Sequence, residues 1–121
     1  MQKPANSKRY DLEERTFCFA KDVRTFVREL PRSLANKEDA AQLVRSSGSV
    51  GANYIEANGS LGKKDFLMRI RISRKEAKES CFWLRLIQVN NDLDLEARRE
   101  KLIRETTELT FIFNSILKKS Q

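Results

Sequence analysis

The fold is decided by residues 45–87, which read RSSGSVGANYIEANGSLGKKDFLMRIRISRKEAKESCFWLRLI. Near the middle of this stretch, Asn58-Gly59 is the kind of pair that ends a helix in the left-handed conformation. Apolar and small side chains then recur at three- and four-residue steps, as they do along the buried face of a helix. We therefore expect one helix at about 37–58 and the next at about 62–90. The inward stripe of the second helix is expected to hold Phe66, Ile70, Ser73, Ala77, Cys81 (or Ser80), Leu84 and Ile87.

Glycine and serine are concentrated at residues 46–51, inside the first of these two helices. Each glycine lowers helix stability by roughly 1 kcal/mol relative to alanine, so packing must compensate. Small side chains let two helix backbones approach closely, and this is the interpretation we favour. The alternative is a loop that cradles phosphate. We reject it because the segment has no glycine-rich turn from strand to helix and no lysine at the spacing of a P-loop.

Helical periodicity also covers residues 11–30 and about 95–118. Pro31 ends the first of these helices. The inward stripes are expected to hold Leu12, Phe19, Val23, Phe26, Val27 and Leu30 in one helix, and Leu95, Leu102, Thr106, Leu109, Phe113 and Ile116 in the other. No segment alternates polar and apolar residues over the length of a strand, so the predicted fold class is all-α.

The connections between the four expected helices are short. Asn36, with Asp39 three residues further on, is predicted to cap the second helix. Residues 90–92 (Asn-Asn-Asp) form a turn that can also cap the last helix. Short connections place successive helices antiparallel, so we expect an up-down four-helix bundle over residues 10–119. Residues 1–9 are predicted to be a flexible basic tail.

The composition limits the class of protein. A chain of 121 residues is expected to form one domain. Histidine is absent, which excludes Ser-His-Asp and Cys-His nucleophile pairs, HExxH zinc sites and ferritin-like di-iron sites. Cys18 and Cys81 are too few for a disulfide framework and are expected to be reduced, semi-buried thiols. No segment is typical of a secretory leader or a membrane span, so we expect a cytoplasmic protein without a membrane partner.

Positive charge is concentrated in the third expected helix. The chain carries 24 basic and 17 acidic residues, and residues 59–90 contribute five of the seven net positive charges. Five cations of that segment fall within an arc of about 80° opposite the core stripe, along roughly 30 Å of helix. They are Lys64, Arg71, Lys75, Lys78 and Arg85, called the basic face below. Such a row can meet several phosphates of a nucleic acid. The simpler alternative is a solvated face that Glu76 and Glu79 partly neutralise.

Apolar side chains interrupt the outer surface of the same helix. Ile72, Phe82, Trp83 and Leu86 project away from the expected core stripe. One monomeric bundle cannot cover all of them, and an exposed large apolar patch is costly. Base stacking is one interpretation. We favour burial against another subunit, because aromatic residues are enriched at subunit interfaces, and so we predict a homo-oligomer.

Acidic and amide side chains offer little chemistry of their own. Asn53 and Glu56 lie one turn apart and could form hydrogen bonds across to the next helix, for example to Arg74 or Lys75. This structural pairing is the expected role, because no nucleophile or metal-ligand set accompanies them. Cys81 lacks a neighbouring base and is expected to be inert.

The chain resembles a known family at these residues. Its N-terminal part, with YDLEERT at 10–16, Phe19-Ala20 and Leu30-Pro31, is similar to that of the bacterial four-helix-bundle proteins often labelled 23S ribosomal RNA intervening-sequence proteins. Residues 45–87 resemble the most specific block of the same family, and the likeness extends over about 10–117. Gly48, Gly59 and Phe82 depart from the family pattern without removing a charge or a core position.

The resemblance implies a ring, usually described as a homopentamer. Some relatives are encoded within insertions in large-subunit ribosomal RNA genes. The fold is also similar to that of the accessory variability protein of diversity-generating retroelements, a basic pentameric barrel that binds nucleic acid and a reverse transcriptase. By that likeness, the nucleic-acid contacts become Lys64, Arg71, Arg74, Lys75, Lys78 and Arg85. The family has no established enzymatic activity.

The leading hypothesis is a non-enzymatic, homo-oligomeric bundle without a cofactor that binds structured RNA, or less favourably DNA, through the basic face. The alternative is an interaction scaffold or accessory subunit that docks an acidic protein or a reverse transcriptase. A third hypothesis, an enzyme or a cofactor-holding bundle that uses Glu56, Glu76 and Glu79, is disfavoured because the chain has no histidine and no pair of nucleophile and base.

Overall fold

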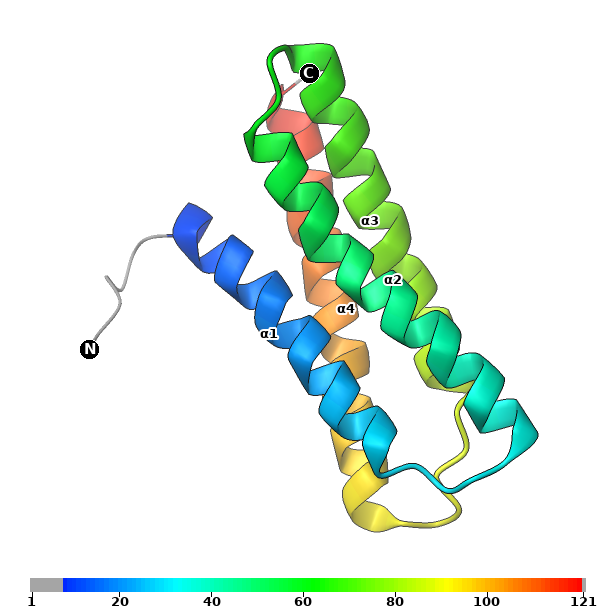
Figure 1. Ribbon diagram of the computed structural model, residues 1–121. Coiled ribbons are helices and arrows are strands. Elements are labelled where there is room, and N and C mark those ends of the chain that lie inside the picture. Colours follow the sequence, from blue (N-terminus) through cyan, green and yellow to red (C-terminus); the bar gives the residue numbers. More distant parts are fainter. Residues whose placement is uncertain (1–7, 121) are drawn as a thin grey trace.

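Four long helices make up the described part of the molecule. The computed structural model describes residues 8–120, and their side chains from Leu12 onward. The helices are α1 (Lys8–Arg28), α2 (Leu34–Asn58), α3 (Lys63–Leu86) and α4 (Leu93–Ser120) (Figure 1). Residues 8–120 contain no strand, so the predicted all-α class is confirmed.

The helices pack side by side. Each helix lies against the next along the chain, and α4 also lies against α1. The connections between the helices alternate between the two ends of the molecule, as the ribbon shows (Figure 1). The most extensive contact is that between α2 and α3, whereas α1 has less extensive contacts with its two neighbours, α2 and α4. Helix α3 therefore has one flank toward α2, one toward α4 and a third side toward solvent.

The core is built from the predicted inward stripes. Its largest fully buried side chains include Phe19, Phe26, Leu43, Ile70, Leu84 and Phe113. Each such side chain contributes roughly 1.5–3 kcal/mol through removal from water. The rings of Tyr54 from α2 and Phe113 from α4 meet across the core at 6.1 Å between centroids. Of the two residues left open, Ser80 is the buried one and Cys81 is half-buried. One position differs from prediction by one residue, since Leu117 is buried while Ile116 is half-buried.

The start of α2 differs from the prediction. Ser33 is the residue that caps this helix, and its hydroxyl accepts a hydrogen bond from the Asn36 backbone N–H. Asn36 itself is buried between two connections. Its Nδ2 donates to the carbonyls of Pro31 and Gln88, and its Oδ1 accepts from the Gln88 backbone N–H. The helix cap predicted at Asn36 was therefore wrong, and this side chain instead joins the α1–α2 connection to the α3–α4 connection.

The other helix ends also show what local sequence signals miss. Gly59 has φ −95°, so α2 does not end in the left-handed conformation predicted for Asn58-Gly59. Within residues 8–120, the residues with left-handed backbone are Asn90 and Asn91, with φ 53° and 66°. Helix α3 ends at Leu86, four residues before the predicted end at 90. Asp92 does cap α4, because its Oδ1 accepts from the Leu95 backbone N–H.

Ion pairs hold α1 against α4. Arg15 bonds to Glu105 and Glu108, and Arg98 of α4 bonds to Glu29 just beyond α1. The hydrogen bond that Arg15 donates to Glu105 raises the pKa of Arg15 above its ordinary value, and the bond that Arg98 donates to Glu29 raises the pKa of Arg98. The expected tail at 1–9 overlaps this helix, since α1 begins at Lys8, and residues 1–7 lie outside the described part.

Candidate nucleic-acid interface

The flank of α3 that faces α2 is packed through small polar side chains. The hydroxyls of Ser46 and Ser80 lie 2.8 Å apart across the two helices. Ser73 Oγ donates to the backbone carbonyl of Val50 at 2.9 Å, although both residues lie within helices. These contacts require the two backbones to approach closely. The interpretation of the glycine- and serine-rich segment as a close-packing surface is therefore confirmed.

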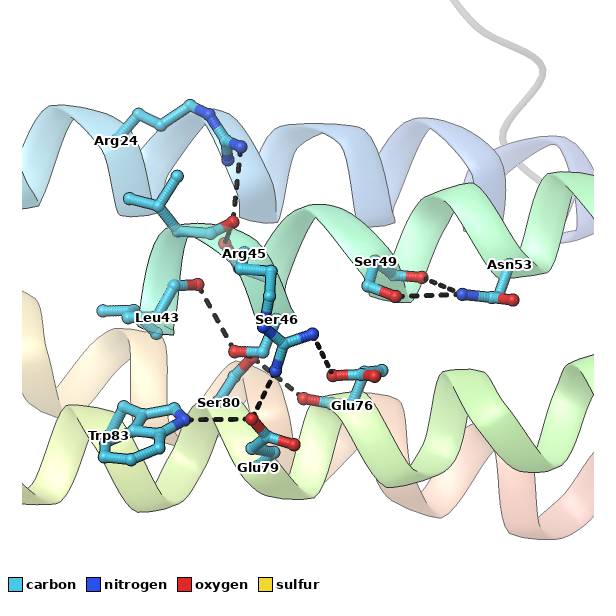
Figure 2. A network of polar contacts seen from close by, with 12 residues as sticks. Arg24, Leu43, Arg45, Ser46, Ser49, Asn53, Glu76, Glu79, Ser80 and Trp83 are labelled. Atoms are coloured by element: carbon cyan, nitrogen blue, oxygen red, sulfur yellow. Dashed lines mark hydrogen bonds and ion pairs between the residues drawn. The ribbon is translucent and has the colours of Figure 1, made fainter. Parts of the chain in front are cut away.

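Two of the three acidic residues of α3, Glu76 and Glu79, face α2, where Arg45 neutralises them (Figure 2). Arg45 Nη1 lies 3.5 Å from Glu76 Oε1, and its Nη2 pairs with Glu79. Glu76 is only 7% exposed, and its Oε1 accepts no hydrogen bond within the described residues. Glu79 also accepts a hydrogen bond from Trp83 Nε1 at 3.2 Å. The alternative in which Glu76 and Glu79 partly neutralise the basic face is therefore not supported, because both carboxylates pair with Arg45.

Asn53 bonds across to α3 as predicted, but its partner is Arg69 and not Arg74 or Lys75, the examples given. Its Oδ1 accepts from Arg69 at 2.9 Å, while its Nδ2 donates to Ser49 within α2. Arg74 instead donates to Asn114 Oδ1 of α4 at 2.8 Å. Glu56 and Lys75 are exposed. Arg69 and Glu76 are seven residues apart, so a helical wheel places them on one flank of α3. This spacing was the available sequence signal for the flank, but only the packing of α2 against α3 assigns their partners.

The basic face lies on the solvent side of α3. Lys64, Arg71, Lys75, Lys78 and Arg85 are all exposed. None of the five forms an ion pair with an acidic side chain of the described residues. Arg74 is half-buried at the edge toward α4. Beyond its first turn, which holds the exposed Asp65, helix α3 therefore separates its charges, with Glu76 and Glu79 toward α2 and unneutralised cations toward solvent, which favours an anionic partner.

The four residues predicted at a subunit interface fall into two groups. Phe82 and Leu86 are exposed, with 53% and 47% of their surface accessible, whereas Ile72 and Trp83 are half-buried. The Phe82 ring meets the Trp83 ring edge to face, with 5.0 Å between centroids. Met68, which the sequence analysis did not single out, is also exposed on this helix. The bundle thus leaves Phe82, Leu86 and Met68 uncovered beside the basic face.

The described residues offer little to a metal ion. No group of three or more cysteine, aspartate or glutamate side chains comes close enough to hold one in this part of the chain. Cys81 is half-buried as expected, whereas Cys18 is exposed. None of the four described helices has an apolar stretch long enough to cross a membrane.

Fold and surface together define a class of small all-α bundle proteins with one basic helix face. The chain belongs to the 23S rRNA-intervening sequence protein family, whose model matches residues 8–115. It is similar in structure to a protein of unknown function from the S23 ribosomal protein family of Bacteroides thetaiotaomicron VPI-5482. The two share 26% sequence identity over 92% of this chain and 98% of the other, with a TM-score of 0.75. No curated protein matches the chain.

Proposed function

We propose that this protein is a non-enzymatic homo-oligomer that binds structured RNA, or with less support DNA, through the basic face of α3. Each subunit is an antiparallel up-down bundle, the subunits form a ring, and the assembly acts in the cytoplasm without a cofactor. The contacts are Lys64, Arg71, Arg74, Lys75, Lys78 and Arg85. The name of the family supports ribosomal RNA as the ligand class.

One observation carries this proposal, namely the separation of charge across α3. Arg45 holds Glu76 and Glu79 on the α2 flank, so the basic face keeps its full charge toward solvent. Cations along one helix match a phosphate backbone, and release of condensed counterions supplies the binding free energy. Repetition of the face around an oligomer converts a weak, salt-sensitive contact into useful avidity.

Salt-dependent binding tests the proposal. Reversing two charges with Arg71→Glu and Lys75→Glu should weaken RNA binding across all sequences and lower the slope of log K against log salt by about two. The matched control reverses Arg28 and Lys37, two exposed cations away from α3, and should leave the slope nearly unchanged. Fluorescence anisotropy over a salt series measures both. Binding by the intact protein that is absent, or that does not depend on salt, would refute the proposal.

A protein partner is the second candidate, and the exposed Phe82 and Leu86 favour it. An acidic protein or a reverse transcriptase could cover these side chains while its carboxylates meet the basic face. A pull-down that survives nuclease treatment and is lost in Phe82→Ala would support this function over RNA binding.

A further inference from the structure

A second basic surface lies where α3 and α4 run side by side. A groove of about 490 Å³ opens between the two helices. Its lining includes Arg71 and Arg74 from α3, and Phe111, Asn114, Leu117 and Lys118 from α4. Leu117 is buried and forms the floor, whereas Arg71, Phe111 and Lys118 are exposed. We call it the α3–α4 groove.

The charges of this groove are of one sign. Three of its lining residues are cations, and none of the described residues that line it is acidic. Arg74 is braced across the groove because it donates to Asn114 Oδ1, which leaves its other N–H groups available. Such a brace lowers the entropy that the guanidinium loses when it binds an anion. The groove is therefore prepared for a ligand with more than one anionic group.

Phe111 gives the groove a further property. Phe111 is 70% exposed, and it lines the groove together with three cations. A free phosphate would gain nothing from an aromatic face, and a double helix keeps its bases stacked inside. A single strand presents unpaired bases and phosphates together, and aromatic rings beside cations are the usual platform for it.

The basic surface continues toward the end of the bundle. The last turn of α4 and the start of α3 line a neighbouring hollow that includes Lys63, Lys119 and Phe66. Lys119 directly follows Lys118 of the groove along α4. Two such grooves facing each other across a two-fold axis would bring cations together, so an isologous contact of two copies through this groove is disfavoured.

We propose that the α3–α4 groove binds a single-stranded segment of RNA, such as a loop or an end. Arg71, Arg74 and Lys118 contact successive phosphates, and one unpaired base stacks on Phe111. This inference rests on the proposed function and deepens it, because it names the form of RNA and adds Phe111 and Lys118, which lie outside the predicted set.

The test compares how substitutions of Phe111 change the binding of single-stranded and double-stranded RNA probes. The probes are an oligouridylate of about twelve nucleotides, which does not pair with itself, and an RNA duplex of the same length. Phe111→Ala should weaken binding of the oligouridylate about fivefold or more and leave duplex binding nearly unchanged. Phe111→Trp should retain affinity, whereas Phe111→Leu, which keeps apolar bulk without an aromatic face, should lose it. Phe17→Ala is the matched control, since Phe17 is an exposed phenylalanine of α1 away from the groove.

The outcomes separate this inference from the proposed function. If neither probe binds, RNA binding itself fails. If both bind and depend on Arg71 and Lys75 while Phe111→Ala changes nothing, only the groove assignment is overturned. A smaller native mass of the Phe111→Ala variant would overturn the groove assignment too, because the phenyl side chain would then be a contact between subunits. If Phe111→Ala weakens binding of a polyglutamate peptide as much as it weakens binding of the oligouridylate, the groove is assigned to an acidic protein instead.

Discussion

The carboxylate of Glu76 is buried between α2 and α3. Its negative charge is compensated by one side chain of the opposite helix, Arg45. Arg45 is half-exposed, yet it reaches both Glu76 and Glu79 (Figure 2). A buried charge that loses its partner costs far more than an exposed pair contributes. The pair therefore has two effects, since it stabilises the contact of α2 with α3 and keeps acidic groups away from the basic face.

Removal of Arg45 alone should destabilise the fold. Arg45→Met leaves the Glu76 carboxylate buried without a counter-charge, so we expect a loss of about 1–3 kcal/mol. Adding Glu76→Gln should restore part of that loss, which a double-mutant cycle measures by urea unfolding at one protein concentration. Arg104→Met, at an exposed arginine of α4, is the control and should change stability little. Additive effects of the two substitutions would contradict the pairing.

At the scale of the elements, the contact of α1 with α2 depends on one glycine. A Cβ atom on Gly51 would lie 2.9 Å from Thr16 Oγ1 and 3.1 Å from Thr16 Cβ. Thr16 is buried, and its hydroxyl donates to the Glu13 carbonyl, so it cannot move aside without cost. At Gly48 the nearest atom is Arg24 Nη2 at 3.2 Å, the far end of a flexible side chain. The two glycines of α2 thus have different roles.

Alanine substitutions should separate these roles. Gly51→Ala should destabilise the protein by about 1–3 kcal/mol, because α1 must shift away from α2. Gly48→Ala should leave stability unchanged or raise it by up to about 1 kcal/mol, since alanine favours the helix and Arg24 can move. Thermal and urea unfolding measure both. Equal losses for the two variants would show that side-chain contact with Thr16 is not what requires glycine at position 51.

At the scale of the whole molecule, the single subunit leaves apolar side chains beside the basic face exposed to solvent. Phe82 and Leu86 lie on α3, whose other sides are occupied by α2 and α4. Aromatic residues of this kind are the usual anchors of subunit interfaces. Assembly through them would place several basic faces on one particle.

Loss of these anchors should weaken the assembly. Phe82→Ala with Leu86→Ala should raise the subunit dissociation constant tenfold or more, since interface anchors contribute about 2 kcal/mol or more. Native mass measured over a concentration series reports it. The control, Phe17→Ala with Leu93→Ala, removes comparably exposed side chains from α1 and from the start of α4 and should leave the mass unchanged. An unaltered mass in the Phe82 and Leu86 variant would exclude this surface as the interface.

The sequence by itself determined the four helices, most of the core and the position of the basic face. These features repeat every three or four residues, and a helical wheel converts such spacing directly into faces. It also indicated that the glycine- and serine-rich segment of α2 is a packing surface, because small side chains inside a long helix need a close neighbour to offset their low propensity.

Only the tertiary structure decided which side chains pair. Asn36 was expected to cap a helix but joins two connections, and local spacing did not indicate that Glu76 lies buried against Arg45. The α3–α4 groove, with Phe111 beside Arg71 and Arg74, likewise combines residues some forty positions apart. Local spacing carries no information on such partners, because they are set by the rotation of each helix about its axis and by its neighbour, which the packing of the whole core determines.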